Sequence, residues 1–238
     1  MSIRHKPRIS ISLLVALILI VLPGSLASAS EQEFDLVDAV DKSESIFGGE
    51  VTKIIKEGKG PDYLMRMYIE KYAKGPRYSV SIPIKLVATK IANLPKPGDR
   101  RIVFIENAVP TERSFDLIEG KAILPYSEQN FETVSTILNP EKRFLASECV
   151  MVCESRNAPS QKDSRLSPVK CYKGPCIGCS FNIRPELNIS KKENRWILFI
   201  ENLVPVDGKF EVQAAVPYSE IFMERLVAVM EKYKGKAR

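Results

Sequence analysis

The chain of 238 residues contains an internal repeat: three short blocks occur twice and in the same order. The first set is Lys-Gly-Pro at 74–76, Val-Phe-Ile-Glu-Asn-Ala-Val-Pro at 103–110 and Leu-Pro-Tyr-Ser-Glu at 124–128, and closely similar blocks return at 173–175, 198–205 and 216–220. The spacing between matched blocks falls from 99 to 95 to 92 residues. Such a drift is typical of two copies whose connecting loops differ in length. The repeat therefore predicts two domains of one fold, joined head to tail.

The first 29 residues have the pattern of a secretory signal peptide. A basic start is followed by an apolar run at 9–22, a Pro-Gly pair and a small-residue cleavage pattern at 27–29. An uncleaved anchor is the alternative, but a bilayer span needs about 20 apolar residues. We therefore expect an exported protein, periplasmic or secreted, without a stable membrane anchor after cleavage. The predicted organisation is a signal peptide at 1–29, a first domain at 30–140 and a second domain at 141–238.

Charge argues against nucleic acid as a partner. The whole chain has a formal net charge of +6, but without the predicted signal peptide 32 basic residues face 29 acidic ones, a balance of +3. No cluster of Lys and Arg interleaved with aromatic residues occurs in that part of the sequence.

Histidine usage argues against catalysis. The one histidine, His5, lies in the predicted signal peptide. The exported part then lacks the commonest general base near neutral pH and the commonest metal ligand. We expect no enzyme, no catalytic or metal-binding residues and no cofactor.

The pattern of apolar residues predicts the same succession of elements in both copies. The first copy is expected to have a helix at 35–45, strands at 46–55, 63–72, 78–86 and 101–106, one more strand or a hairpin at 115–124, and a helix that begins at Ser127. The second is expected to have a helix at 141–147, strands at 149–154, 168–172, 179–183, 195–201 and 209–216, and a helix that Ser219 caps. Five strands that close on a helix indicate a small barrel, so the fold class is mainly β with flanking helices.

The sequence pattern around several of these strands resembles that of the netrin-like modules, a family that includes the tissue inhibitors of metalloproteinases. The residues that carry the resemblance are Ile46, Phe47, Gly49, Val51, Lys74, Gly75, Pro76, Arg101, Val103 and Phe104. The resemblance implies two tandem five-stranded barrels of the OB type, each with helices packed against one side. The family's inhibitors chelate zinc through a mature N-terminal cysteine, whereas this chain would begin at Ser30 or Glu31. The resemblance therefore implies the fold and leaves inhibition in doubt.

All five cysteines fall in the second copy: Cys149, Cys153, Cys171, Cys176 and Cys179. In an exported protein they are candidates for disulfides, with two bridges between the first strand and the Lys-Gly-Pro turn and one cysteine left over. Which cysteines pair is open. The alternative is a redox or metal site at the Cys-x-x-Cys pair 176–179. Asn188 begins a glycosylation sequon that has meaning only in a eukaryotic secretory route.

Three functions remain as hypotheses. The first is an exported, non-catalytic tandem binding module that contacts a protein or a cell-surface ligand. The alternatives are a metalloprotease-inhibitor-like protein and a thiol-disulfide or metal-binding protein that uses the Cys171–Cys179 cluster. The repeated Ile-Glu-Asn-x-Val-Pro is either a ligand loop or a simple strand exit whose glutamate points to solvent, and we favour the strand exit. Tyr126 and Tyr218 are expected to pack at the barrel edge.

Overall fold

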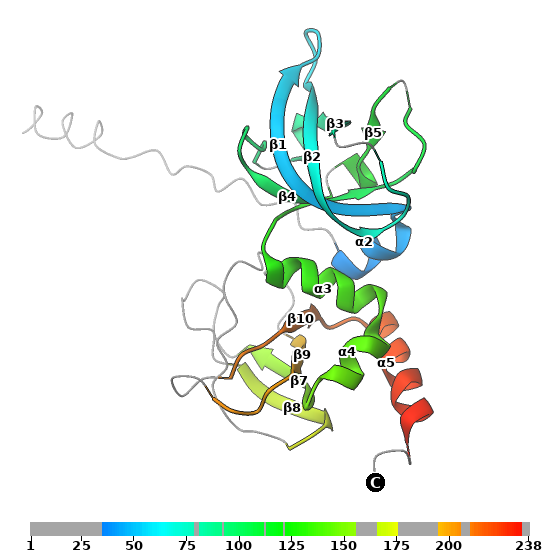
Figure 1. Cartoon of the computed structure of the whole chain (residues 1–238), viewed down its shortest axis with the longest axis vertical. Coiled ribbons are helices and arrows are strands. Elements are labelled where there is room, and N and C mark those ends of the chain that lie inside the picture. The colour runs from blue at the N-terminus through cyan, green and yellow to red at the C-terminus, as the bar shows by residue number, and fades with distance from the viewer. Residues whose placement is uncertain are drawn as a thin grey trace, which may run out of the picture. The chain divides into compact units, whose positions relative to one another are not determined.

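The computed structural model describes residues 35–234, except for 79–80, 92, 112, 121, 156–165, 176–194 and 206–209. Within this part the chain is mainly β, with helices flanking two sheets (Figure 1). Residues 32–238 form one compact unit. The predicted signal peptide, Cys176, Cys179, the strand expected at 179–183 and the Asn188 sequon lie outside the described residues.

The first half follows the predicted order of elements closely. Asp35 caps the opening helix, because its carboxylate accepts hydrogen bonds from the amides of Val37 and Asp38. Ser127 caps the closing helix in the same way, through the amide of Asn130. The elements are α2 (Leu36–Lys42), β1 (Ser45–Lys56), β2 (Asp62–Lys74), β3 (Ser81–Val87), η1 (Ala88–Lys90), β4 (Arg100–Ile105), β5 (Phe115–Asp116), η2 (Ile118–Gly120), β6 (Ile123–Pro125) and α3 (Glu128–Leu138).

The first sheet differs from the expected five strands. Among the described residues it has six, in the order β5-β3-β2-β1-β4-β6. The segment at 115–124, expected as one more strand or a hairpin, forms two short strands, β5 and β6, which η2 separates and which pair with β3 and β4 instead of with each other. Glu119 and Gly120 in η2 have positive φ angles of 51° and 70°, which no strand accommodates.

The first sheet curls until its two sides are linked (Figure 1). β5 pairs with β3 in parallel. The next residue, Leu117, bridges to Ile105 of β4, and the amide of Glu106 donates to the carbonyl of Asp116 at 3.0 Å. Because β4 pairs in turn with β1, the pairings run in a circuit through β1, β2, β3, the β5–Leu117 segment and β4.

The four described strands of the second half repeat the plan of β1, β2, β4 and β6. Its elements are α4 (Pro140–Ala146), β7 (Cys149–Ser155), β8 (Leu166–Lys173), β9 (Arg195–Ile200), β10 (Ala214–Pro217) and α5 (Glu220–Tyr233). The order β10-β9-β7-β8 corresponds to β6-β4-β1-β2. Cys149 pairs with Ile200 at the position where Ser45 pairs with Ile105, and the matched repeat blocks fall in register. Even the irregularities recur: the register shifts of β1 at 46/47 and 48/49 return in β7 at 150/151 and 152/153.

Helices fill the space between the two sheets. In Figure 1, α3 lies between β2 on one side and β10 on the other. One hydrophobic core joins these helices to residues from both sheets, including Ile102 and Phe104 of β4 and Ile197 and Phe199 of β9. There are also two smaller cores, one in each half. The first contains residues of the first half alone, and the second contains residues of the second half alone. The two halves thus share one hydrophobic core, and each half also has a separate core.

Candidate functional site

The two copies of Glu-Asn-x-Val-Pro form equivalent turns at the ends of β4 and β9, which we call the exit loops (residues 106–110 and 201–205). In the first, the amide of Ala108 donates to the Glu44 carboxylate at 2.8 Å. In the second, the amide of Leu203 donates to the Glu148 carboxylate at 2.9 Å. Each glutamate stands just before the first strand of its half, so a side chain from the sheet holds each loop in place. Both turns end a strand, as the sequence predicts.

The Lys-Gly-Pro turns lie beside the same glutamates. The Lys74 ammonium donates to the carbonyls of Val40 and Asp41 at the end of α2. Lys173 donates to the carbonyls of Phe144 and Leu145 at the end of α4, and burial lowers the pKa of this lysine. A helix C-terminus attracts a cation, so the repeated lysine secures the helix that precedes each first strand. The sequence showed that the lysine is repeated, but it did not reveal that the lysine binds the end of a helix.

The glycines of these turns bring them close to the backbone of Glu44 and Glu148. Gly75 has a φ of +87° and Gly174 a φ of +72°, a conformation that favours glycine. A Cβ on Gly75 would lie 2.5 Å from the carbonyl oxygen of Glu44, and one on Gly174 would lie 2.3 Å from that of Glu148. Each half therefore presents its Lys-Gly-Pro turn and its exit loop on either side of one glutamate.

The exit loops expose an apolar side chain in both halves. Val109 is 75% exposed and Val204 is 67% exposed. The next most exposed large apolar residue in the described part of the chain is Ile221, at 54%. The residue before each valine, Ala108 or Leu203, is partly buried. Each loop thus holds a valine outward on an anchored backbone.

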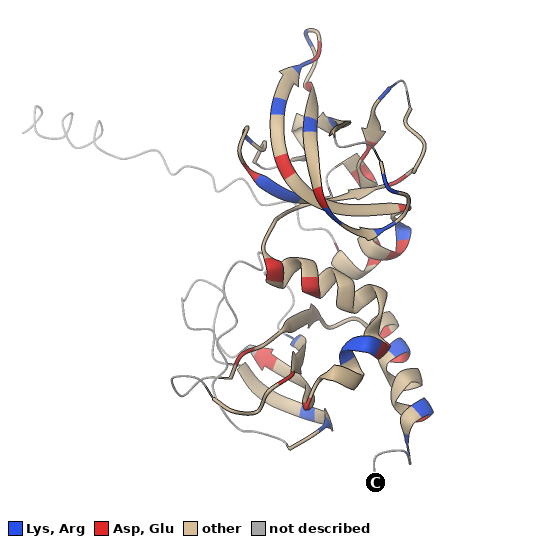
Figure 2. Ribbon diagram, viewed as in Figure 1, with Lys and Arg blue, Asp and Glu red and all other residues tan. Residues whose placement is uncertain are grey.

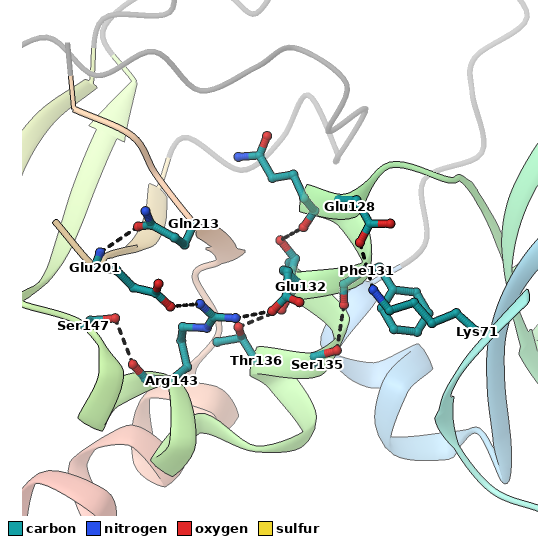
Figure 3. Close-up of polar contacts among 12 residues, drawn as sticks. Lys71, Glu128, Phe131, Glu132, Ser135, Thr136, Arg143, Ser147, Glu201 and Gln213 are labelled. Atoms are coloured by element: carbon teal, nitrogen blue, oxygen red, sulfur yellow. Dashed lines mark hydrogen bonds and ion pairs between the residues drawn. The ribbon is translucent and has the colours of Figure 1, made fainter. Parts of the chain in front are cut away.

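Glu201 corrects one prediction. The glutamate of the second exit loop was expected to point to solvent, but it forms an ion pair with Arg143 of α4, as Figure 3 shows. Arg143 also pairs with Glu132 of α3, so one arginine connects α3, α4 and the end of β9. Gln213 accepts a hydrogen bond from the Glu201 amide at 2.6 Å. Sequence reasoning missed Arg143, because the register places Ala39 at the equivalent position of the first half and no repeated pattern marks it.

The start of α3 has a second polar group, also drawn in Figure 3. The Lys71 ammonium lies 2.8 Å from the Glu128 carboxylate and 4.7 Å from the centre of the Phe131 ring. The hydroxyl of Tyr126 donates to the same carboxylate at 2.8 Å. The hydrogen bond from Lys71, supported by that from Tyr126, lowers the pKa of Glu128. This group attaches α3 to β2.

The repeated tyrosines pack at the edges of the sheets in a common manner. The Arg100 guanidinium lies 4.1 Å from the centre of the Tyr126 ring, and that of Arg195 lies 6.0 Å from the centre of the Tyr218 ring. The tyrosine amides donate to the carbonyls of the same arginines, at 3.0 and 3.1 Å. These contacts agree with a packing role.

The described cysteines converge inside the second sheet. Cys149 and Cys153 lie on the same face of β7, fully buried with Met151, as the sequence predicts for the two cysteines. Cys171 of β8 packs against this core, and the Cys149 thiol donates to the carbonyl of Pro175 at 3.6 Å. The pairing of the cysteines stays a prediction, because Cys176 and Cys179 lie outside the described residues.

Other signals of chemistry are few in the part of the chain that the structure describes. No three His, Cys, Asp or Glu side chains there are grouped so that they could hold a metal ion. No helix in the same part combines the length and the apolar character needed to cross a membrane. Lys and Arg are interspersed with Asp and Glu over both sheets and the helices (Figure 2).

Comparison with known proteins gives no assignment. A scan against protein-family models finds no match, and a search of the curated proteins finds none either.

Proposed function

We propose that the chain is an exported, non-catalytic tandem binding module whose exit loops contact a partner protein. In this proposal residues 30–140 and 141–238 are two OB-type domains of the netrin-like kind, released by cleavage of the signal peptide at 1–29. The partner is a protein or a ligand on a cell surface, and no cofactor takes part.

The strand pairings of the first half support the OB-type assignment. A five-segment circuit with β1 paired to both β2 and β4, and β3 parallel to β5, is the arrangement of a small closed barrel. β6 then extends one edge beyond the circuit. The second half supports the assignment through its matched strand order, registers and bulges.

The observation that carries the binding function is the equivalent exposure of Val109 and Val204. Single exposed apolar residues are ordinary on protein surfaces. Here, however, the two most exposed large apolar side chains of the described residues occupy one position of a repeat, and a glutamate anchors each loop. An anchored loop loses little conformational entropy when a partner buries its side chain, which favours binding.

The two alternatives have less support. The thiol-disulfide or metal-binding alternative depends on Cys171, Cys176 and Cys179, and of these only Cys171 is among the described residues, where it packs against a buried core. A metalloprotease inhibitor of the netrin-like type needs an N-terminal cysteine, which the predicted mature N-terminus lacks. Titration of metalloproteases with the purified protein, read as stoichiometric loss of activity, tests the inhibitor directly.

Substitution of both valines tests the binding function. We expect that Val109→Asp together with Val204→Asp abolishes capture of an exported partner from the periplasmic or culture fraction, and that each single variant weakens it. The control is Val169→Asp, because Val169 is 53% exposed on β8 but lies outside the exit loops. The proposal fails if the double variant, shown to be folded by circular dichroism, retains the same partner in the same amount as the control.

A further inference from the structure

A cavity of about 640 Å³ opens in the first half, away from the exit loops. Its walls come from Ala88 in η1, from described residues between η1 and β4, and from Arg101 of β4. The lining residues are Ala88, Ile91, Asn93, Leu94, Lys96, Asp99 and Arg101. Three of them are apolar and four are polar or charged, so the cavity places an apolar surface beside charged groups.

Asp99 and Arg101 form the polar side of the cavity and are held firmly. The Asp99 carboxylate accepts hydrogen bonds from the Lys96 amide at 2.9 Å and from Nη2 of Arg101 at 2.6 Å. Both bonds hold the pKa of Asp99 below its usual value. The turn itself is fixed to β1, because Val51 exchanges two backbone hydrogen bonds of 2.8 Å with Gly98 and Asp99. The guanidinium therefore has a defined position before any ligand arrives.

Arg101 retains unused donor capacity. Asp99 accepts from Nη2 alone, and Nε is buried without a hydrogen-bond partner. Among the described contacts nothing accepts from Nη1 either. A buried donor without a partner destabilises the folded state, so its presence calls for an explanation. Lys96 and Arg101 together outweigh Asp99 by one positive charge, so an anion with a single charge balances the site.

We propose that this cavity binds a carboxylate that carries a short apolar body. The carboxylate lies against the Arg101 guanidinium, with the Lys96 ammonium at the rim, and the body packs on Ala88, Ile91 and Leu94. A planar carboxylate matches the fork of an arginine and can accept two parallel hydrogen bonds from it. A phosphate dianion fits less well, because its second charge meets Asp99 with no cation left over. The carboxylate comes either from a free organic acid or from the C-terminus of a peptide.

Nuclear magnetic resonance tests the site in the full mature chain labelled with ¹⁵N, through the Nε–Hε signal of Arg101. The probes are sodium hexanoate, the peptide acetyl-Ala-Ala-Leu, its C-terminal amide and inorganic phosphate. We expect saturable shifts of this signal with hexanoate or with the free peptide, and the tighter of the two identifies the source of the carboxylate. Equal binding of the peptide amide, equal binding of phosphate, or no saturable shift with either carboxylate would overturn the proposal.

Variants distinguish binding in this cavity from non-specific attraction of an anion to positive charge. Arg101→Gln should weaken binding of the better carboxylate at least about tenfold, the usual effect of losing one charge-assisted hydrogen bond. Ala88→Phe should weaken it similarly by filling the cavity while both cations remain. The matched control is Arg100→Gln, since Arg100 pairs with Glu70 and does not line the cavity. If Arg100→Gln weakens binding as much as Arg101→Gln, or if folded Ala88→Phe binds like the wild type, the cavity is not the site.

Discussion

At the scale of single residues, Gly49 shows how tightly β1 and β2 are packed at a bulge. A Cβ on Gly49 would lie 2.0 Å from the carbonyl oxygen of Tyr68 and 3.0 Å from the Cα of Ile69. Both are backbone atoms of the neighbouring strand, so no side-chain rotation relieves the contact. The register shift between Gly48 and Gly49 brings the two backbones this close. Glycine is therefore required at this position for steric reasons.

Gly49→Ala is predicted to destabilise the protein by about 3 kcal/mol, the upper part of the range for overpacking in a folded interior. Urea unfolding followed by circular dichroism measures the change. Gly60→Ala is the matched control, because nothing lies within 4 Å of a Cβ built there. An unfolding midpoint of Gly49→Ala equal to that of Gly60→Ala would contradict the steric argument.

At the scale of elements, α3 depends on polar contacts at its first turn. Glu128 occupies the N-terminal end of the helix, where a negative charge is favourable, and it accepts hydrogen bonds from Lys71 and Tyr126. These partners lower the pKa of Glu128 below 4.5 in the folded protein. The charged form therefore adds stability above that value, and the contribution disappears as the pH falls through the folded pKa.

The Glu128→Gln variant tests this linkage. It should unfold at a lower urea concentration than the wild type at about pH 7, and the difference should shrink as the pH falls through the folded pKa of Glu128 towards about pH 3. Salt should also reduce the difference at neutral pH, since the pair is exposed. Glu57→Gln in the exposed β1–β2 turn serves as the control. A difference that persists unchanged at about pH 3 would mean that the carboxylate charge is not its source.

The elements that the sequence predicted well are those with local causes. Ser127 and Ser219 cap helices at the expected positions, and the alternation of β2 places Met65, Met67 and Ile69 inward. Asn139 ends α3 and also caps α4 through the amide of Lys142. Local spacing and side-chain chemistry determine all of these features.

Other features depend on contacts between distant segments, and the sequence did not reveal them. The split of 115–124 into β5 and β6 follows from pairings with β3 and β4. The ion pairs of Arg143 join residues 11 and 58 positions away, and the repeat gives no hint of them. The cavity near Arg101 is lined by residues of η1 and of the start of β4. No sequence motif predicted that these residues lie together.

At the scale of the whole described molecule, α3 explains why the halves are joined. One side carries Phe131 and Val134, which are buried in the shared core. The opposite side carries Thr133 and Thr136, which are also buried. Their hydroxyls donate to the carbonyls one turn earlier in the helix, so both side chains are buried with their hydrogen-bond donors satisfied. A helix that is buried on both sides packs against both sheets at once.

This shared core predicts that the two halves unfold in a single transition. Trp196, the one tryptophan of the chain, lies on β9 and reports the second half by fluorescence. Met65→Ala removes volume from the core of the first half alone, and Ile102→Ala removes it from the shared core. Each should cost about 3 kcal/mol. Both should lower the urea midpoint of Trp196 fluorescence as much as that of far-ultraviolet circular dichroism, whereas the surface control Val169→Ala should leave both probes unchanged. If Met65→Ala lowers the midpoint seen by circular dichroism and leaves that of Trp196 in place, the halves are separate folding units, and α3 joins them without coupling their stability.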